Sequence, residues 1–222
     1  MTAAPPVRAL LLAGGVPPYT DPWHPFAETS DRLGALAEGL GWSLERADDP
    51  GARLAAGLDG VDVLLVNAPA GEDGTDPAVA AAADAALAAF LARGGGAFAL
   101  HIAATTLLGL PRWRGLTGAR WIEGVSGHPP LGPCRVRGHD DPRVPGDLEL
   151  IDERYTGLEL DGDRTVLVSY DDEAGATHPL VWAREVDGAR VVVDTFGHDA
   201  RSFDSPSHHE LLERTLRWVA RG

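Results

Sequence analysis

The sequence predicts an α/β protein built on a mostly parallel central sheet. The first observation is a set of short, almost entirely apolar runs at residues 7–13, at residues 61–67 and immediately before His101. Such runs are typical of strands that are buried on both faces. The second observation is that helix-length amphipathic segments separate these runs. Strands that alternate with helices of this length form βαβ units, and βαβ units build parallel sheets.

The first elements follow in this order along the chain. Residues 7–13 form a strand that stops at two glycines, and the loop after it is rich in Pro and Gly and carries His24. Thr29 or Ser30 is the expected cap of the next helix. That helix has one leucine face (Leu33, Leu36 and Leu40) and ends at Gly41. Residues 42–46 form the next strand.

The third strand and the helix after it have the strongest local signals. Residues 61–67 form the strand, which ends in the polar side chain of Asn67. Asp76 is placed as the N-cap of the helix and Pro77 lies in its first turn. A run of glycines ends this helix and leads into the strand that finishes at His101.

The second half of the chain is predicted to be rich in β-structure. Residues 111–133 are irregular, and a long irregular segment in a compact domain usually covers a functional site. The elements expected after Cys134 are a strand at 165–170, a β-hairpin whose strands 180–186 and 189–196 flank Asp187-Gly188, and a final helix that begins at Ser205 and Pro206. Residues 1–222 are interpreted as one domain.

Composition excludes several classes of partner and mechanism. The net charge is −14, and all 19 cationic residues are arginine. This charge argues against nucleic acid as a partner, and the lack of lysine excludes Schiff-base catalysis. The first six residues lack a signal-peptide pattern, and no apolar run reaches the ~20 residues of a membrane span. We therefore expect a soluble, cytoplasmic protein with no membrane partner. The single cysteine, Cys134, is expected to be a small core residue.

His101 is the first candidate for chemistry. It ends a strand that the βαβ pattern places centrally, and ligands bind at the carboxyl ends of such strands. Asn67 ends a neighbouring strand, and His24 lies in the loop after the first strand. The three side chains are therefore expected to converge although they are distant in sequence. A histidine there suits general acid–base catalysis or metal ligation.

Other polar residues form a second group of candidates. His24, His128, His178 and His198 lie in loops beside Pro or Gly, where ordinary hydrogen-bonded histidines are also common. Glu153 and Tyr155 follow an apolar strand and could act on sugar hydroxyls, whereas the alternative is a polar strand end neutralised by Arg154. His139, His208 and His209 are expected to be solvated.

The sequence lacks the usual motifs of covalent catalysis and of metal binding. The turn after the central strand reads His101-Ile102-Ala103-Ala104, so the position where α/β-hydrolases and class I glutamine amidotransferases hold Ser or Cys has no such nucleophile. No glycine-rich nucleotide-binding motif is present, and no cofactor is predicted. A divalent metal stays open. The chain has no HExxH or HxH motif, so a site would need distant histidines and a carboxylate brought together.

The order and spacing of several motifs resemble the ThuA-like, trehalose-utilisation family of the class I glutamine amidotransferase-like superfamily. The matching stretches are Phe98-Ala99-Leu100-His101, Trp121 to Pro129, Asp152-Glu153-Arg154-Tyr155, His178 to Trp182, Arg190 to Asp199, and the final helix with Trp218. The resemblance implies a flavodoxin-like three-layer α/β/α sandwich without the amidotransferase cysteine. It also implies carbohydrate catabolism, often of disaccharides oxidised to 3-keto-sugars. The loop around His24 departs most from the family pattern.

The leading hypothesis is an enzyme that acts on a sugar or 3-keto-sugar by hydrolysis, isomerisation or lyase chemistry. The catalytic residues would be His101, Glu153 and His198. The substrate, a small carbohydrate, would contact His24, Asn67, Trp121 (or Trp113), His128, Tyr155 and His178, with the tryptophan stacking on a sugar ring. The alternative is a non-catalytic sugar-binding or regulatory protein. Histidines that converge within ~4 Å of one another and of a carboxylate favour the enzyme. A homo-oligomer is also left open.

Overall fold

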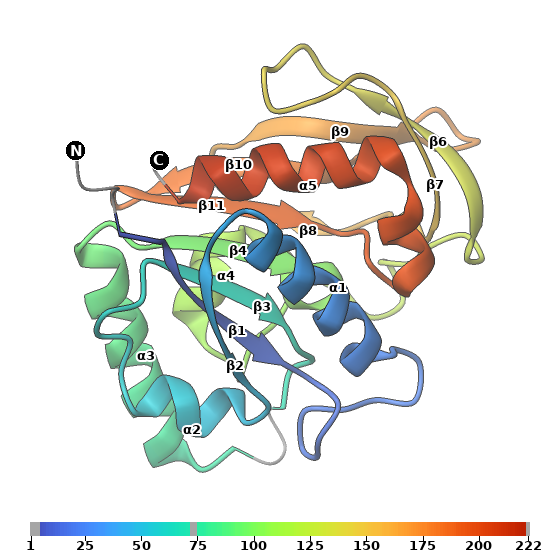
Figure 1. Cartoon of the computed structure of the whole chain (residues 1–222). Coiled ribbons are helices and arrows are strands. Elements are labelled where there is room, and N and C mark those ends of the chain that lie inside the picture. Colours follow the sequence, from blue (N-terminus) through green and yellow to red (C-terminus); the bar gives the residue numbers. More distant parts are fainter. Residues whose placement is uncertain (1–4, 72–74, 221–222) are drawn as a thin grey trace.

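The central sheet of this computed structural model spans the molecule (Figure 1). The model describes residues 5–71 and 75–220, and within these ranges nine strands form one sheet in the order β2-β1-β3-β4-β11-β10-β9-β6-β7. The strands are β1 (Arg8–Ala13), β2 (Ser43–Ala47), β3 (Val63–Asn67), β4 (Gly96–Leu100), β6 (Gly132–Gly138), β7 (Leu148–Asp152), β9 (Thr165–Asp171), β10 (Thr177–Val186) and β11 (Ala189–Asp194). Two short strands, β5 (Ala119–Arg120) and β8 (Glu159–Leu160), pair with each other.

The sheet has a parallel and an antiparallel half. Strands β2, β1, β3, β4 and β11 pair in parallel, whereas β10, β9, β6 and β7 continue the sheet in antiparallel pairs. The parallel half contains the apolar strands of the sequence prediction, and every residue of β3 and β4 is buried. The carboxyl ends of β1, β3, β4 and β11 therefore lie along one edge of the sheet.

Helices cover both faces of the sheet, which confirms the three-layer α/β/α architecture (Figure 1). Alternate residues of β1 point into the two cores. Leu10 and Leu12 pack with one set of helices, whereas Ala9 and Leu11 pack with the other. The first face carries α2 (Pro50–Ala55), α3 (Pro77–Ala92) and α4 (Pro111–Thr117), and the second carries α1 (Phe26–Gly39) and α5 (Pro206–Val219).

Several local predictions are confirmed at the residue level. The carboxylate of Asp76 accepts a hydrogen bond from the backbone N–H of Ala78 at the start of α3, and Ser205 caps α5. The hairpin turn between β10 and β11 has positive φ at both central residues, 52° at Asp187 and 81° at Gly188. An Asp-Gly pair favours this type of turn because both residues tolerate the left-handed region.

The start of α1 differs from the prediction. The helix begins at Phe26 with Pro25 as N-cap, so Thr29 and Ser30 lie inside it rather than capping it. Their buried hydroxyls accept hydrogen bonds from the side-chain amide of Asn67. These two residues therefore attach the helix to the end of β3.

The segment 111–133, predicted to be irregular, begins with a helix. Pro111 opens α4, and Gly118 closes it in the left-handed conformation with φ of 64°. Trp113 is fully buried, and its indole N–H donates to the carbonyl of Ala103. Trp113 is thus a core residue and not a platform for a sugar ring, because its one polar atom is used within the fold.

The structure bears on the expectations about membrane spans and about Cys134. In the described part of the chain, no helix is both long and apolar enough to cross a membrane. Residues 1–4 of the segment considered for a signal peptide lie outside the described residues. Cys134, on β6, was expected in the core; it is only partly buried and packs at the margin of the core that α1 and α5 cover.

Candidate functional site

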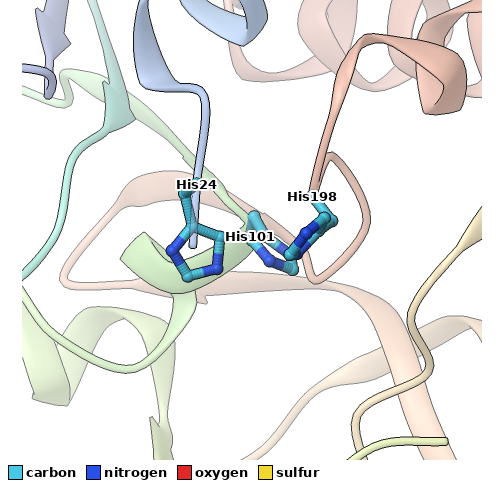
Figure 2. A group of neighbouring side chains, drawn as sticks. All are labelled: His24, His101 and His198. Atoms are coloured by element: carbon cyan, nitrogen blue, oxygen red, sulfur yellow. The ribbon is translucent and has the colours of Figure 1, made fainter. Parts of the chain in front are cut away.

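Three histidines from distant parts of the chain meet at the carboxyl edge of the parallel strands (Figure 2). His24 lies in the loop after β1, His101 directly follows β4, and His198 lies in the loop after β11. One ring nitrogen from each histidine lies within 4.8 Å of the corresponding nitrogens of the other two. The ring centroids are 4.9 to 5.3 Å apart. We call these residues the histidine cluster.

His101 occupies a strained turn between β4 and a short 3₁₀ helix (His101–Ala104). Its φ is 51°, a left-handed conformation that a residue with a side chain adopts only at a cost. The residue is 1% exposed. Its Nδ1 donates to the carbonyl of Thr195 at 2.8 Å, which leaves Nε2 facing the hydroxyl of Tyr155 at 3.2 Å. This contact fixes both the tautomer and the ring orientation.

His24 is oriented by Asp21 within the same loop. One carboxylate oxygen of Asp21 accepts hydrogen bonds from the backbone N–H groups of Trp23 and His24. The other oxygen lies 2.7 Å from Nδ1 of His24. Asp residues commonly fold loops through such short-range bonds. The loop therefore holds His24 with its Nε2 available to the cluster.

His198 is positioned by a carboxylate from β7, the edge strand of the antiparallel half. Asp152, the last residue of β7, accepts hydrogen bonds from the backbone N–H of Gly197 at 2.7 Å and of His198 at 3.4 Å. Asp152 also accepts from the backbone N–H of Glu153 at 2.8 Å. This one buried side chain therefore fixes the His198 loop relative to Glu153.

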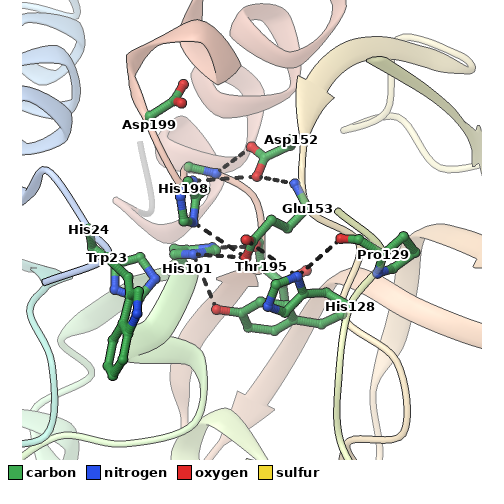
Figure 3. A network of polar contacts seen from close by, with 12 residues as sticks. Trp23, His24, His101, His128, Pro129, Asp152, Glu153, Thr195, His198 and Asp199 are labelled. Atoms are coloured by element: carbon green, nitrogen blue, oxygen red, sulfur yellow. Dashed lines mark hydrogen bonds and ion pairs between the residues drawn. The ribbon is translucent and has the colours of Figure 1, made fainter. Parts of the chain in front are cut away.

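Glu153 is the carboxylate on which the site converges (Figure 3). It is 6% exposed, and its oxygens lie 3.3 Å from Nδ1 of His198, 3.3 Å from Nδ1 of His128 and 3.8 Å from Nε2 of His101. The Nδ1 atom of His198 is buried and makes no aligned hydrogen bond. The ring of Tyr155 packs against His101 and Trp121, at centroid distances of 5.0 and 5.2 Å.

Burial and neighbouring charge separate the protonation states of these groups. Burial, with the neighbouring histidines, holds the pKa of His101 well below its usual range. Burial, with the charges of Glu153 and Asp152, raises the pKa of Tyr155 well above 10. Contact with Glu153 raises the pKa of His198, and burial raises the pKa of Asp152 to about 6. Near neutral pH the site therefore combines a neutral imidazole as proton acceptor with a protonated phenol as donor.

A cavity of about 540 Å³ adjoins the histidine cluster. Ile102, next to His101, and Trp121, which packs on Tyr155, line it together with Arg114 and Arg120. This volume is typical of small-molecule sites. None of the three cluster histidines lines this cavity, but Ile102 and Trp121 place it beside them, whereas a larger hollow of about 870 Å³ lies at the opposite edge of the sheet, beside Arg8 and Asp62. The position of the ionisable groups, rather than cavity size, selects the candidate site.

Comparison with protein families gives a match along most of the chain. The model of the family described as ThuA, trehalose utilisation, matches residues 22–219. The chain belongs to the ThuA family. Comparison with curated protein sequences finds no match. The matched residues include all three members of the histidine cluster, as well as Glu153 and Tyr155, so this site belongs to the ThuA region itself.

Solved structures share the fold of this ThuA-family protein. A ThuA-like protein from Parabacteroides merdae is 16% identical, with a TM-score of 0.75, and the match covers 97% of this chain and 90% of the other. A second, from Bacteroides uniformis, is 17% identical with a TM-score of 0.73, covering 99% and 93%. A β-galactosidase from Rahnella sp. R3 is 13% identical with a TM-score of 0.64, covering 98% of this chain and 31% of that enzyme. The fold is also compatible with the glutamine amidotransferase-like superfamily, as the resemblance implied.

Some predicted site residues of this ThuA-family protein lie together, and others do not. His24, His101, His128, Glu153, Tyr155, His198 and Trp121 form one connected group. Asn67 instead donates its amide to α1, as described above. His178 uses Nδ1 to accept from the backbone N–H of Gly157, and its Nε2 lies 3.0 Å from Asp172. The contacts of Asn67 and His178 thus hold neighbouring segments in place.

His208 was expected to be solvated, and this prediction is wrong. The ring is fully buried at the start of α5, with Nε2 3.0 Å from Asp194 and Nδ1 3.0 Å from Ser202. The sequence shows two adjacent histidines at a helix start, and only the helix orientation decides that His208 faces the sheet while His209 faces solvent.

Two positioning groups of the site were not predicted from the sequence, Asp21 and the carbonyl of Thr195, and the buried Asp194–His208 pair was not predicted either. Asp21 had a usable signal, since an aspartate shortly before a loop histidine is placed to form a turn with it. A backbone carbonyl has no sequence signal, because every residue carries one.

Proposed function

We propose that this ThuA-family protein is an enzyme of sugar utilisation that transfers protons to and from a small sugar or 3-keto-sugar. The observation that carries the proposal is the convergence of His101, His128 and His198 on the buried Glu153, beside a phenol that keeps its proton. The family description, trehalose utilisation, supports a sugar as the substrate class.

With a 3-keto-sugar as substrate, several reactions can begin with the same proton transfer. Removing the proton from carbon 2, next to the ketone, places the electron pair in an enolate whose oxygen needs a hydrogen-bond donor. The enolate can be reprotonated, which isomerises the sugar, or can expel the substituent at carbon 1, which is a lyase reaction. Addition of water to the eliminated product then gives net hydrolysis. Isomerisation, lyase chemistry and net hydrolysis of this substrate therefore share their first step.

The residues divide into a proton acceptor and a donor for that step. Nε2 of His101 and the carboxylate of Glu153 are the acceptors, separated by 3.8 Å. The hydroxyl of Tyr155, 3.2 Å from Nε2 of His101, is a neutral donor suited to the developing oxyanion. Trp121 and the adjoining cavity offer an apolar face for the sugar ring and two arginines for its hydroxyls.

The alternative, a non-catalytic sugar-binding or regulatory protein, is less well supported. The sequence-based criterion for an enzyme was a set of histidines within ~4 Å of one another and of a carboxylate. Nitrogens of His101, His128 and His198 lie 3.3 to 3.8 Å from Glu153, and those of His24, His101 and His198 lie within 4.8 Å of one another, which supports the enzyme without reaching that limit between the histidines. A protein that only binds sugar has no need for a buried carboxylate surrounded by imidazoles, because burying such ionisable groups costs stability.

The direct test is hydrogen exchange and turnover with 3-ketotrehalose, with trehalose as a comparison substrate. In D₂O, the wild-type protein is expected to exchange the proton at carbon 2 and to release product. His101→Gln, Glu153→Gln and Tyr155→Phe are each expected to lower the rate by about 10²-fold or more. Nuclear magnetic resonance measures the exchange, and chromatography measures the product.

His209→Gln is the matched control, because this exposed histidine of α5 lies outside the site. Wild-type rates in both His101→Gln and Glu153→Gln would refute the proposal. Saturable sugar binding without exchange or turnover would favour the non-catalytic alternative. Cytoplasmic location and assembly into a homo-oligomer stay predictions, as does the absence of a nucleic-acid partner.

A further inference from the structure

The histidine cluster has the form of a metal site as well as of an acid–base site. Its three nitrogens lie within 4.8 Å of one another although the residues come from three loops (Figure 2). Imidazoles repel one another when protonated and gain little from this proximity when neutral. A cation that binds all three lone pairs gives a physical reason for the arrangement.

The second nitrogen of each ring is held by an oxygen. Nδ1 of His24 lies 2.7 Å from the Asp21 carboxylate, and Nδ1 of His101 lies 2.8 Å from the carbonyl of Thr195. Metal-binding histidines almost always direct their other nitrogen to a carboxylate or a backbone carbonyl, which fixes the tautomer. Nε2 is consequently the nitrogen that His24 and His101 offer to the cluster.

His198 follows the same pattern with a looser contact. Its Nδ1 lies 3.3 Å from Glu153 but is buried without an aligned hydrogen bond. An unsatisfied buried nitrogen is costly and rare in folded proteins, and it calls for a missing partner. A metal ion on Nε2 would fix the ring with Nδ1 directed at Glu153, the carboxylate 3.3 Å away.

We propose that His24, His101 and His198 bind one divalent transition-metal ion, preferably Zn²⁺. Imidazole nitrogens suit Zn²⁺ and other late first-row ions, and three protein ligands leave a position open for water or a substrate oxygen, as in catalytic zinc sites. The carboxylates of Asp21 and Glu153 offset the charge of the ion from its immediate surroundings.

The inference goes beyond the proposed function, because ion binding needs no sugar. It also refines that function. With an ion bound, Nε2 of His101 is a ligand, and Glu153 is the remaining proton acceptor. The open position would hold the ketone or hydroxyl oxygen of the substrate, beside the phenol of Tyr155.

The test uses the full-length protein, freed of metal by a chelator, and the metal ions alone. Titration with Co²⁺ is expected to give one ion per chain with the visible absorption of a low-coordinate site, and Zn²⁺ is expected to displace it. His24→Ala and His198→Ala are each expected to weaken Zn²⁺ binding at least 100-fold by calorimetry. Asp21→Asn, which keeps all three ligands, is expected to weaken it 10- to 100-fold.

His209→Ala serves as the control and is expected to bind as the wild type does. Circular dichroism of each variant checks that it folds. Asp21→Asn lies in a loop outside the sheet and keeps all three histidines, so it tests metal binding without removing a ligand. Absence of stoichiometric binding, or equal binding by the wild type and all three site variants, would overturn the inference. If the protein turns over the keto-sugar but binds no Zn²⁺, the metal inference fails while the proposed function stands. If the site binds Zn²⁺ but no sugar reacts, the proposed function fails while the metal inference stands.

Discussion

At the scale of single residues, the site depends on oxygens that hold the far side of each imidazole. Asp21, Thr195 and Glu153 decide which nitrogen of His24, His101 and His198 faces the centre. Because a histidine can accept a proton or bind a metal only through a free lone pair, these contacts determine the chemistry as much as the histidines do. The same principle applies away from the site, where Asp194 fixes His208.

Stability is expected to depend on pH through the pair of Asp194 and His208. Burial alone would lower the pKa of His208, but the charge and hydrogen bond of Asp194 outweigh burial and raise it above 6.5. A raised folded-state pKa stabilises the protein below the unfolded value, and this contribution disappears as the pH rises through the folded value. Asp194→Asn removes it. The difference in unfolding free energy between wild type and variant should therefore be larger at pH 6 than at pH 9.

Urea unfolding at the two pH values measures that difference. Each unit of pKa change corresponds to about 1.4 kcal/mol. Asn keeps an oxygen for the backbone N–H of Phe196, which the carboxylate of Asp194 now binds, so the variant changes the charge more than the shape. A difference that is equal at both pH values would contradict a protonated His208.

Asn67 is expected to contribute to stability rather than to substrate binding. Its amide donates to the hydroxyls of Thr29 and Ser30 at 2.9 Å each, in a buried environment. Asn67→Ala should lower the unfolding free energy by about 1–3 kcal/mol, because it leaves buried polar groups without a partner. The KM of the folded variant for its sugar should stay unchanged. Unchanged stability together with a raised KM would restore the substrate-binding role that the sequence suggested.

At the scale of elements, the site depends on strands that deliver their ends to one edge of the sheet. Strands β1, β4 and β11 supply the three histidine loops, and β7 supplies Asp152, Glu153 and Tyr155 from the antiparallel half. The position of β4 is in turn fixed by α5. At Gly96, the first residue of β4, an added Cβ would overlap the backbone carbonyl of Val219 at the end of that helix.

Two glycine substitutions are expected to have opposite effects. Gly96→Ala should destabilise the protein by about 1–3 kcal/mol, because β4 and α5 cannot both keep their positions. Gly115→Ala, in the middle of α4, meets no atom within 4 Å and should stabilise it by about 0.4–1 kcal/mol by restricting the unfolded chain. Thermal and urea unfolding measure both values. A harmless Gly96→Ala would show that α5 yields easily at this contact.

At the scale of the whole molecule, an acidic chain surrounds a site built for protons or a cation. The net charge of −14 raises the local concentration of cations and disfavours polyanions. Because the cluster joins loops from β1, β4 and β11, a ligand bound there links segments that would separate on unfolding. Ligand binding should therefore be visible as global stability.

Zn²⁺ is expected to raise the melting temperature of the metal-free protein. Free Zn²⁺ at 100 times its Kd adds about 2.7 kcal/mol, which corresponds to roughly 5–10 °C for a chain of this size. Excess chelator should reverse the increase, and His24→Ala should abolish it, whereas His209→Ala should retain it. Differential scanning fluorimetry measures these shifts. An equal increase in the His24→Ala variant would place the stabilising ion elsewhere.

The sequence by itself determined the α/β class, most strands and helices, the caps at Asp76 and Ser205, the Asp187-Gly188 hairpin and the resemblance to the ThuA family. These features rest on local patterns of burial, turns and caps, which a sequence records directly. It also placed His101 at the carboxyl end of a central strand.

Only the tertiary structure decided which polar groups meet. It turned Asn67 toward α1, buried His208, and brought Glu153 from β7 to the loops of His101 and His198. Such choices depend on side-chain direction and on the packing of segments far apart in the chain. Those properties arise when the two cores assemble around the sheet, and no local pattern contains them.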